Sequence, residues 1–455
     1  MLRLTWVQPE DLIGHELRQA AQDGRDATGA ERRWVAAGGH LAPDRAGASA
    51  DPAPPGLRTL AEELLDELAA APAPLAATEP ATYRNPSAPA PPPARPGDPG
   101  TELRRLHAAW LGRAVGCLLG KPVEKLTLTG IRAIARSTGN WPLTTWFTER
   151  GLDPRIAREH PWNRRSRPTS LAENIDGMPE DDDLNYPLLG LLLLQRHGHG
   201  FTTEDVAKLW LDELPAGRTF TAERVAYRNL LAGLEPPLTA TYRNPFREWI
   251  GAQIRADVFG WTRPGDPAGA AELAHRDASL THTANGVYGE MFVAAAIAHA
   301  AGPAPTTVHA TLAAALAHVP PRSRYAQAIR FGIDTAAAEP TGTPEAFERV
   351  VDALHRRYGD HHWVHVLPNA ALLAAALTHA DGDFAGSICR VVSGGWDTDS
   401  NGATAGSIAG LLAGDPDALP ASWTAPLKNR LATTVAGFDG IGFDELARLT
   451  LEARA

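Results

Sequence analysis

Acidic side chains gather at two places that lie far apart along the chain. The first cluster, Glu180 to Asp183, runs directly into an apolar stretch that begins at Leu188. The second, Asp397 with Asp399 and Ser400, runs into a stretch of small residues. Carboxylates packed this densely repel one another and resist burial unless a cation or strong hydrogen-bond donors neutralise them. Because hard divalent cations prefer oxygen ligands, the pattern predicts that both clusters converge on Mg²⁺-like or Mn²⁺-like ions.

The spacing within each cluster suits a pair of cations. Asp181 and Asp182 are adjacent, so at the start of a helix their carboxylates diverge and can bridge two ions. Asp397 and Asp399 are separated by one residue, which places both on the same side of an extended or turning backbone, and Ser400 adds a neutral oxygen. Such a centre can hold a substrate diol and activate water. The alternative is that both clusters only cap the helices that follow and complement their dipoles.

Composition excludes several classes of protein. The formal net charge of −10 argues against a nucleic-acid backbone as the main partner. Two cysteines, Cys117 and Cys389, are too few for a disulfide framework or a thiolate zinc site. The first residues meet charge too early for a signal peptide, and no apolar run approaches the roughly 18 residues of a membrane helix. We expect a cytoplasmic protein without a membrane partner and, in the absence of a coiled-coil pattern, a monomer.

The chain divides into three regions by composition. Residues 1–71 are expected to form a small accessory region, and not the seat of the chemistry, with helices at 8–23 and 57–71. Residues 72–100 are rich in proline and alanine and are predicted to be a linker. Residues 101–455 have a helical pattern almost throughout and predict an all-α, orthogonal bundle. Its expected helices are 102–119, 126–136, 183–196, 203–213, 222–233, 249–259, 286–300, 306–317, 324–338, 344–357, 368–379, 384–392 and 402–412.

Small residues at four-residue spacing mark the expected centre of this bundle. Glycine in a helix interior costs about 1 kcal/mol, so its repetition indicates helices whose backbones are in close contact. The repeats are Gly112, Gly116 and Gly120; Gly402, Gly406 and Gly410; and Ala294 with Ala298.

Five sequence blocks over roughly 101–450 resemble, in order, those of the ADP-ribosylglycohydrolase family. They are GRAVGCLLGKPVEKL (112–126), EDDDLNYPLLGLLL (180–193), WIGAQIRADVFG (249–260), LTHTANGVYGEMFVAAAIA (280–298) and GGWDTDSNGATAGSIAGLLAG (394–414). In the first block Cys117 stands where the family often has an aspartate. The resemblance implies the all-α bundle of that family, preceded here by a small, mostly helical N-terminal extension, and a binuclear magnesium or manganese centre.

The resemblance also implies roles for individual residues. The metal-ligand positions of the family fall on Glu180, Asp181, Asp182, Asp397, Asp399 and Ser400. Glu124 matches a glutamate that contacts the substrate ribose, and Glu124 or Asp182 is the expected catalytic carboxylate. The third and fourth blocks and the residue before the second acidic motif supply further expected substrate contacts: Arg255, Asp257, His282, Gly286, Tyr288 and Trp396.

Three functions are compatible with this pattern. The first is a metal-dependent hydrolase that cleaves the glycosidic bond between ADP-ribose and an acceptor, which is a protein side chain or another group. Cleavage at ribose C1 passes through an oxocarbenium-like transition state that a carboxylate stabilises. The second is an N-glycosidase acting on a smaller ribosyl compound, such as a nucleoside or nucleotide. The third is a non-catalytic binding protein on the same fold, against which the intact carboxylate set argues.

Overall fold

A computed structural model describes residues 3–41, 47–82 and 98–454 of the chain. Helices dominate throughout, and the described ranges contain isolated β-bridges but no β-strand. The predicted all-α class is therefore confirmed. None of the helices in these ranges combines the length and the apolar character needed to span a membrane. Of the predicted linker 72–100, residues 83–97 lie outside the described residues.

Two helices cross at the centre of the molecule with their backbones in direct contact. They are α4 (Pro99–Gly120) and α20 (Thr398–Ala413), and they run antiparallel. A Cβ atom added to Gly116 would overlap the carbonyl oxygen of Gly402, and one added to Gly112 would overlap that of Gly406. At the end of α4, the Thr398 hydroxyl donates to the Gly120 carbonyl at 2.9 Å. The prediction that the glycine repeats mark closely packed central helices is confirmed.

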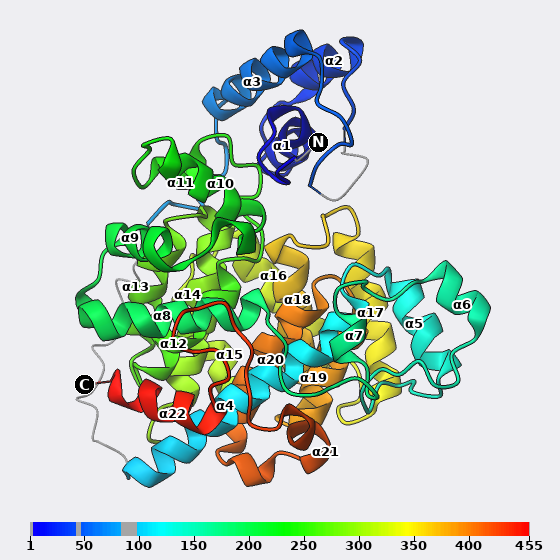
Figure 1. The fold of residues 1–455 in the computed structure, drawn as a ribbon, viewed down its shortest axis with the longest axis vertical. Helices are drawn as coiled ribbons and strands as arrows, with labels where there is room; N and C mark the ends of the chain where they lie inside the picture. The colour runs from blue at the N-terminus through cyan, green and yellow to red at the C-terminus, as the bar shows by residue number, and fades with distance from the viewer. Residues whose placement is uncertain (1–2, 42–46, 83–97, 455) are drawn as a thin grey trace.

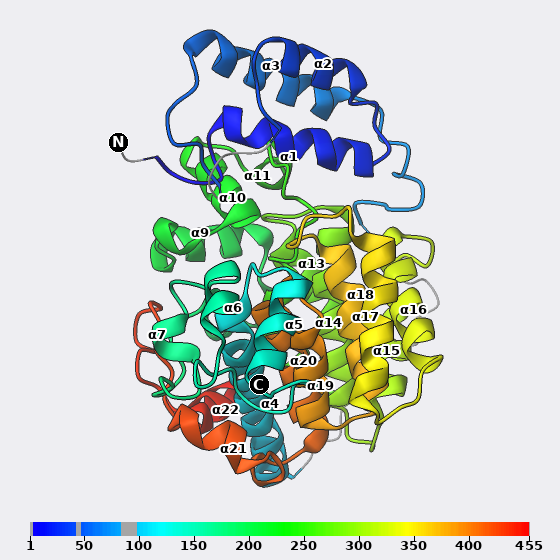
Figure 2. The ribbon, with the colours of Figure 1, turned by 90° about the vertical axis from the view of Figure 1, so that its right-hand side faces the viewer.

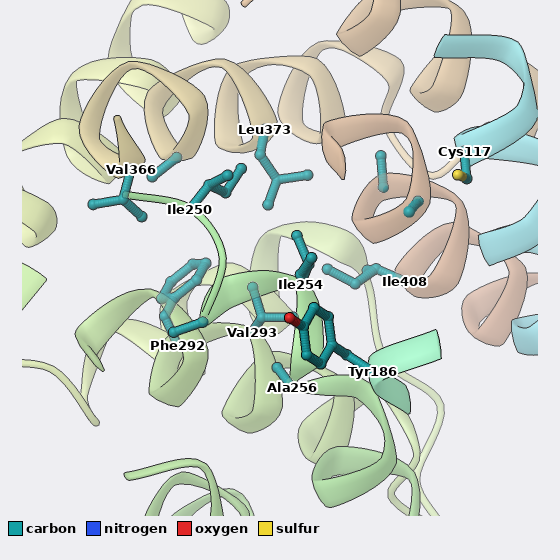
Figure 3. Packing of buried hydrophobic residues seen from close by; sticks show 14 of the residues in the cluster. Cys117, Tyr186, Ile250, Ile254, Ala256, Phe292, Val293, Val366, Leu373 and Ile408 are labelled. Atoms are coloured by element: carbon teal, nitrogen blue, oxygen red, sulfur yellow. The ribbon is translucent and has the colours of Figure 1, made fainter. Parts of the chain in front are cut away.

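Further helices surround this pair and complete the core. The apolar cluster runs through the whole bundle, and Figure 3 shows part of it, with Ile254 and Ile408 pointing toward the same interior. These helices are α8 (Asp182–His197), α12 (Asp257–Trp261), α13 (Pro267–Ala278), α14 (Ala284–Ala300), α15 (Val308–Leu316), α16 (Arg324–Ala337), α17 (Pro344–Tyr358), α18 (Val366–Ala380), α19 (Phe384–Ser393) and α22 (Phe443–Glu452).

Shorter elements lie at the periphery or in the connections. The α-helices are α5 (Leu128–Ser137), α6 (Pro154–Glu159), α7 (Arg167–Ser170), α9 (Thr203–Glu213), α10 (Thr221–Leu231), α11 (Leu238–Thr241) and α21 (Ala421–Thr424). The 3-10 turns are η1 (Lys121–Val123), η2 (Gly198–Gly200), η3 (Ala216–Arg218), η4 (Gln253–Arg255), η5 (Pro416–Ala418) and η6 (Ala425–Leu427).

The N-terminal extension forms a three-helix layer against one end of the bundle. It consists of α1 (Pro9–Gln22), α2 (Thr28–Ala36) and α3 (Pro55–Ala70), drawn in blue beside α10 and α11 in Figures 1 and 2. Arg247 of the bundle is buried between Glu16 and Asp23 of the extension, at 2.7 and 2.6 Å. Breaking a buried ion pair strongly destabilises a protein because it leaves an unpaired charge. The extension is therefore held firmly in place.

The helices differ from the expected ones in three informative places. The predicted helix 249–259 is a 3-10 turn followed by the short α12, because the backbone before the turn pairs instead with the loop at Val364, whose carbonyl accepts from Ile250 N–H at 2.9 Å. Helix α20 begins at Thr398, four residues before the expected start. Helices α2, α13 and α22 were not expected; α13 has a recognisable start, since Asp266 caps it and Pro267 occupies its first position.

The α4–α20 contact leads to a prediction about stability. Replacing Gly116 by alanine would force the two backbones apart, because the added methyl group meets a carbonyl oxygen and not a movable side chain. We expect Gly116→Ala to lower the free energy of unfolding by about 3 kcal/mol or to prevent folding. Chemical denaturation followed by far-ultraviolet circular dichroism measures this. Gly56→Ala in α3 is the control, since nothing lies within 4 Å of its added Cβ; equal stability losses in the two variants would contradict the prediction.

Candidate functional site

Both acidic clusters face one cavity of about 630 Å³. The wall includes Asp181 and Asp182 from the start of α8 and Asp397 and Asp399 from the start of α20. These residues come together because the end of α4 touches both helix starts. Gly120 abuts Thr398, and the Lys121 ammonium contacts the Asp181 carboxylate.

The starts of α8 and α20 present their carboxylates in different ways. Asp181 is the N-cap of α8, where its side chain accepts from the Asp183 N–H at 3.0 Å. Asp397 is the N-cap residue of α20, and its N–H donates to Asn369 Oδ1 at 3.1 Å. Because α20 begins at Thr398, Asp399 and Ser400 lie in the first turn of the helix and not in the extended backbone that the sequence suggested.

Burial, reinforced by neighbouring negative charges, raises the pKa of several carboxyl groups in the cavity wall. Burial, together with the charges of Glu124 and Asp181, raises the pKa of Asp399 to about 7. Burial and the charges of Asp181, Asp399 and Glu124 raise the pKa of Asp182 well above its ordinary value. Burial and Asp399 do the same to the pKa of Asp397. The carboxylates of the wall therefore carry more negative charge than the cationic side chains of the wall neutralise.

Asp181 is the exception because it has a cationic partner. Burial alone would raise its pKa, but the Lys121 ammonium outweighs that effect and the pKa of Asp181 is lowered. Lys121 also donates to the Glu180 carbonyl at 3.3 Å. Its side chain is almost completely buried, so Lys121 links the end of α4 to the first acidic cluster.

A second polar group lies beneath the cavity around Asp183. The Cys117 thiol donates to Asp183 Oδ2 at 3.8 Å, and the Asp183 Oδ1 atom has no hydrogen-bond partner. One ligand atom from each of Cys117, Asp181 and Asp183 lies within 4.8 Å of the others, which makes them a candidate buried metal-binding group. Burial and the nearby carboxylates raise the pKa of the Cys117 thiol, so it is a proton donor here. Arg113 lies 3.6 Å from Asp183 and supplies positive charge.

Glu124 projects into the cavity directly after the η1 turn. Its Oε2 atom accepts from the Asn163 amide at 2.6 Å, and its Oε1 atom lies 3.1 Å from the Lys125 ammonium. Both partners also line the cavity. Each oxygen of Glu124 is thus fixed by one donor, and the carboxylate is held facing the acidic wall.

Glu180 also lines the cavity, as expected, but it is paired. Its Oε2 atom lies 2.9 Å from the Arg218 guanidinium, and its Oε1 atom accepts from Asn185 at 3.4 Å. Ser400 lines the cavity beside Asp399. All seven predicted metal-binding and catalytic residues therefore contribute to the wall of one cavity: Glu124, Glu180, Asp181, Asp182, Asp397, Asp399 and Ser400.

The expected substrate contacts of the third block lie behind the wall. Arg255 is buried and donates to Asp277 at 2.5 Å and to Glu223 at 3.2 Å. Asp257 is also buried and accepts from Arg113 at 2.8 Å. Neither residue is among those that line the cavity, whereas Glu223 is. Arg255 therefore supports Glu223, and Asp257 anchors α4.

The expected substrate contacts of the fourth block, like those of the third block, lie behind the cavity wall. His282 is buried; its Nδ1 atom lies 2.6 Å from the Thr281 hydroxyl, and its Nε2 atom lies 3.9 Å from Glu223. The Tyr288 hydroxyl donates to the Pro80 carbonyl at 2.5 Å, in the segment that follows the extension. Gly286 packs against the backbone of Arg247, whose carbonyl oxygen would lie 2.5 Å from an added Cβ. These residues are not part of the lining either.

Trp396 precedes the second acidic motif but is not among the residues that line the cavity. Its ring stacks on His355 with 3.9 Å between centroids and an interplanar angle of 1°. Its φ angle is +56°, and His355 Nε2 lies 2.8 Å from the Gly394 carbonyl. Trp396 thus stabilises the turn that precedes Asp397 and sets the position of that residue.

Several residues of the wall were not singled out from the sequence. Basic and hydroxyl side chains come from the region of α7 and from the turn before α10. Lys121 and Lys125 flank Glu124 within the first block, which is the one signal that could have identified them. Those missed include Lys121, Lys125, Asn163, Arg165, Ser166, Thr169, Arg218, Phe220, Glu223 and Trp363.

The match of the chain to a known family is extensive. The family model described as ADP-ribosylglycohydrolase matches residues 98–454. The chain belongs to the ADP-ribosylglycohydrolase family. This is a family of glycohydrolases that act on ADP-ribosylated substrates and are generally metal-dependent. The bundle that carries both acidic helix starts therefore corresponds to the family domain.

One similar solved structure is described as an ADP-ribosylglycohydrolase-related protein complex. It is 20% identical, covers 78% of this chain and 98% of its own, and superposes with a TM-score of 0.47. No curated protein matches the chain.

Proposed function

We propose that the protein is a metal-dependent hydrolase that cleaves the glycosidic bond between ADP-ribose and an acceptor. The observation that carries the proposal is the convergence of both acidic helix starts and Glu124 on one cavity. Basic side chains on the same wall, Lys125, Arg165 and Arg218, complement an anionic ligand. Family membership supports the same reaction class.

The donor set of the cavity fits two divalent cations. Asp182, Asp397 and Asp399 all have raised pKa values because they are buried and because other carboxylates lie close to them. Such an array of unneutralised oxygens is what Mg²⁺ or Mn²⁺ prefers. The residues that would hold the two cations are Glu180, Asp181, Asp182, Asp397, Asp399 and Ser400. When bound, such ions orient a diol and acidify water.

Glu124 is the residue we assign to proton transfer. Its carboxylate is held by Asn163 and Lys125, and it faces the acidic wall across the same cavity. A carboxylate fixed in this way can accept a proton from water as the water attacks C1 of the ribose, and can stabilise positive charge that develops on the ring. Asp182, half-buried in the wall, is the second candidate for this role.

Cation binding should be measurable without any substrate. We expect Mg²⁺ or Mn²⁺ to raise the thermal unfolding temperature, because a ligand at about 100 times its Kd adds roughly 2.7 kcal/mol of stability. The gain should be larger at pH 8 than at pH 6, since protons compete with cations for Asp399, whose pKa is raised to about 7. Differential scanning fluorimetry checks both statements. The double variant Asp182→Asn/Asp399→Asn should lose the response, and an unchanged response in it would contradict the assignment.

Turnover should depend on Glu124. Glu124→Gln keeps the shape of the side chain but removes the proton acceptor, so we expect at least a hundred-fold loss of rate, within the usual range of about 10²–10⁴ for general acid–base groups. Release of ADP-ribose from arginine-linked, serine-linked and nucleobase-linked substrates, with and without Mn²⁺, is the assay. Cation-induced stabilisation should persist in the variant.

The exposed Glu159 on α6 provides the matched control. Glu159→Gln should keep full activity. Full activity in Glu124→Gln would remove Glu124 from the mechanism, and activity on unmodified nucleosides alone would favour the smaller ribosyl substrate.

A further inference from the structure

The N-terminal extension contributes to the wall of the cavity, although it lies outside the residues that match the family. Thr5 and Trp6 line the same cavity as the acidic helix starts, whereas the family match begins at residue 98. We propose that Trp6 forms part of the substrate site and contacts the planar base of a ribosyl ligand. This inference rests on the proposed function and deepens it by adding a residue that determines specificity.

The ring of Trp6 is held in a fixed orientation. The backbone N–H of Trp6 donates to the Gly47 carbonyl at 2.6 Å, and Gly47 lies so close to the ring that an added Cβ would be 2.6 Å from the indole. Phe246 and Trp249 pack edge-on against the ring, with centroids at 5.5 and 6.2 Å. Trp6 itself has a φ angle of +66°, which is uncommon for a residue with a side chain. Trp6 is half-buried, and it is among the residues that line the cavity.

The segment that carries Trp6 is tied to α10 of the bundle and to α1 of the extension. The Thr5 hydroxyl accepts a hydrogen bond from Arg224 of α10, and Arg3 forms ion pairs with Glu10 and Asp11 at 2.9 and 3.0 Å. Farther along, Arg324 of α16 pairs with Glu79 at 2.7 Å and with Glu248 at 3.0 Å. These contacts fix the extension relative to the cavity, so Trp6 is a permanent part of its wall.

The aromatic and apolar side chains that line the cavity together with Trp6 favour a flat, apolar group of a ligand. Phe220 and Trp363 line the same cavity as Trp6, together with Ile250 and Val364. Aromatic surfaces of this kind bind nucleobases by stacking and by edge contacts. The carboxylates of the helix starts, which would hold the cations that orient the ribose, line the same cavity. A ligand with a sugar and an aromatic base can therefore contact both.

Binding of ADP-ribose and of ribose 5-phosphate, which lacks the base, tests this inference. With Mn²⁺ present, we expect Trp6→Ala to weaken ADP-ribose binding about ten-fold, the effect of losing one base–aromatic contact. Affinity for ribose 5-phosphate should change less than about two-fold, since its contacts do not include the base. Thermal-shift titrations measure both ligands. Trp6→Phe should retain most of the affinity for ADP-ribose.

Leu4 provides the control within the same segment. It is 57% exposed and does not line the cavity, so Leu4→Ala should bind both ligands as the unsubstituted protein does. Unchanged ADP-ribose affinity in Trp6→Ala, or an equal loss for both ligands, would overturn the role of Trp6 and leave the proposed function intact. Failure of the unsubstituted protein to bind either ligand would overturn the proposed function and this inference together.

Discussion

Direct backbone contact between α4 and α20 is the constraint on which the rest of the structure depends. Gly112, Gly116 and Gly120 face Gly410, Gly406, Gly402 and Thr398 with no room for a side chain. This contact fixes the start of α20 against the end of α4. The turn after α4 then reaches the start of α8 through Lys121. One helix end thereby brings together two acidic segments that lie far apart in the sequence.

This packing gathers carboxylates in one wall of the cavity. The cationic side chains nearby neutralise only some of them. Lys121 neutralises Asp181, and Arg113 lies beneath Asp183, but Asp182, Asp397 and Asp399 keep raised pKa values. Concentrating like charges in a buried wall destabilises a protein, and such arrangements are typical of functional sites. Under the proposed function, divalent cations would neutralise this charge, and the same charge would attract them to the site.

The sequence predicted those features that local pattern encodes. Helix class, the glycine contact and the acidic helix starts were all recognisable because spacing and residue type express them directly. Burial is a property of tertiary packing, so Arg255 and Tyr288 resembled substrate contacts while the structure places them behind the wall or against the extension. Trp6 could not be found at all, because its position depends on how the extension packs against the bundle.

The central claim is that the starts of α8 and α20 form one cation site. Anomalous diffraction from crystals grown with Mn²⁺ tests it most directly. The account predicts two peaks in the cavity, each about 2–2.5 Å from carboxylate oxygens of both clusters, including Asp182 and Asp399. Manganese found only at the molecular surface, or bound to one cluster alone, would contradict it.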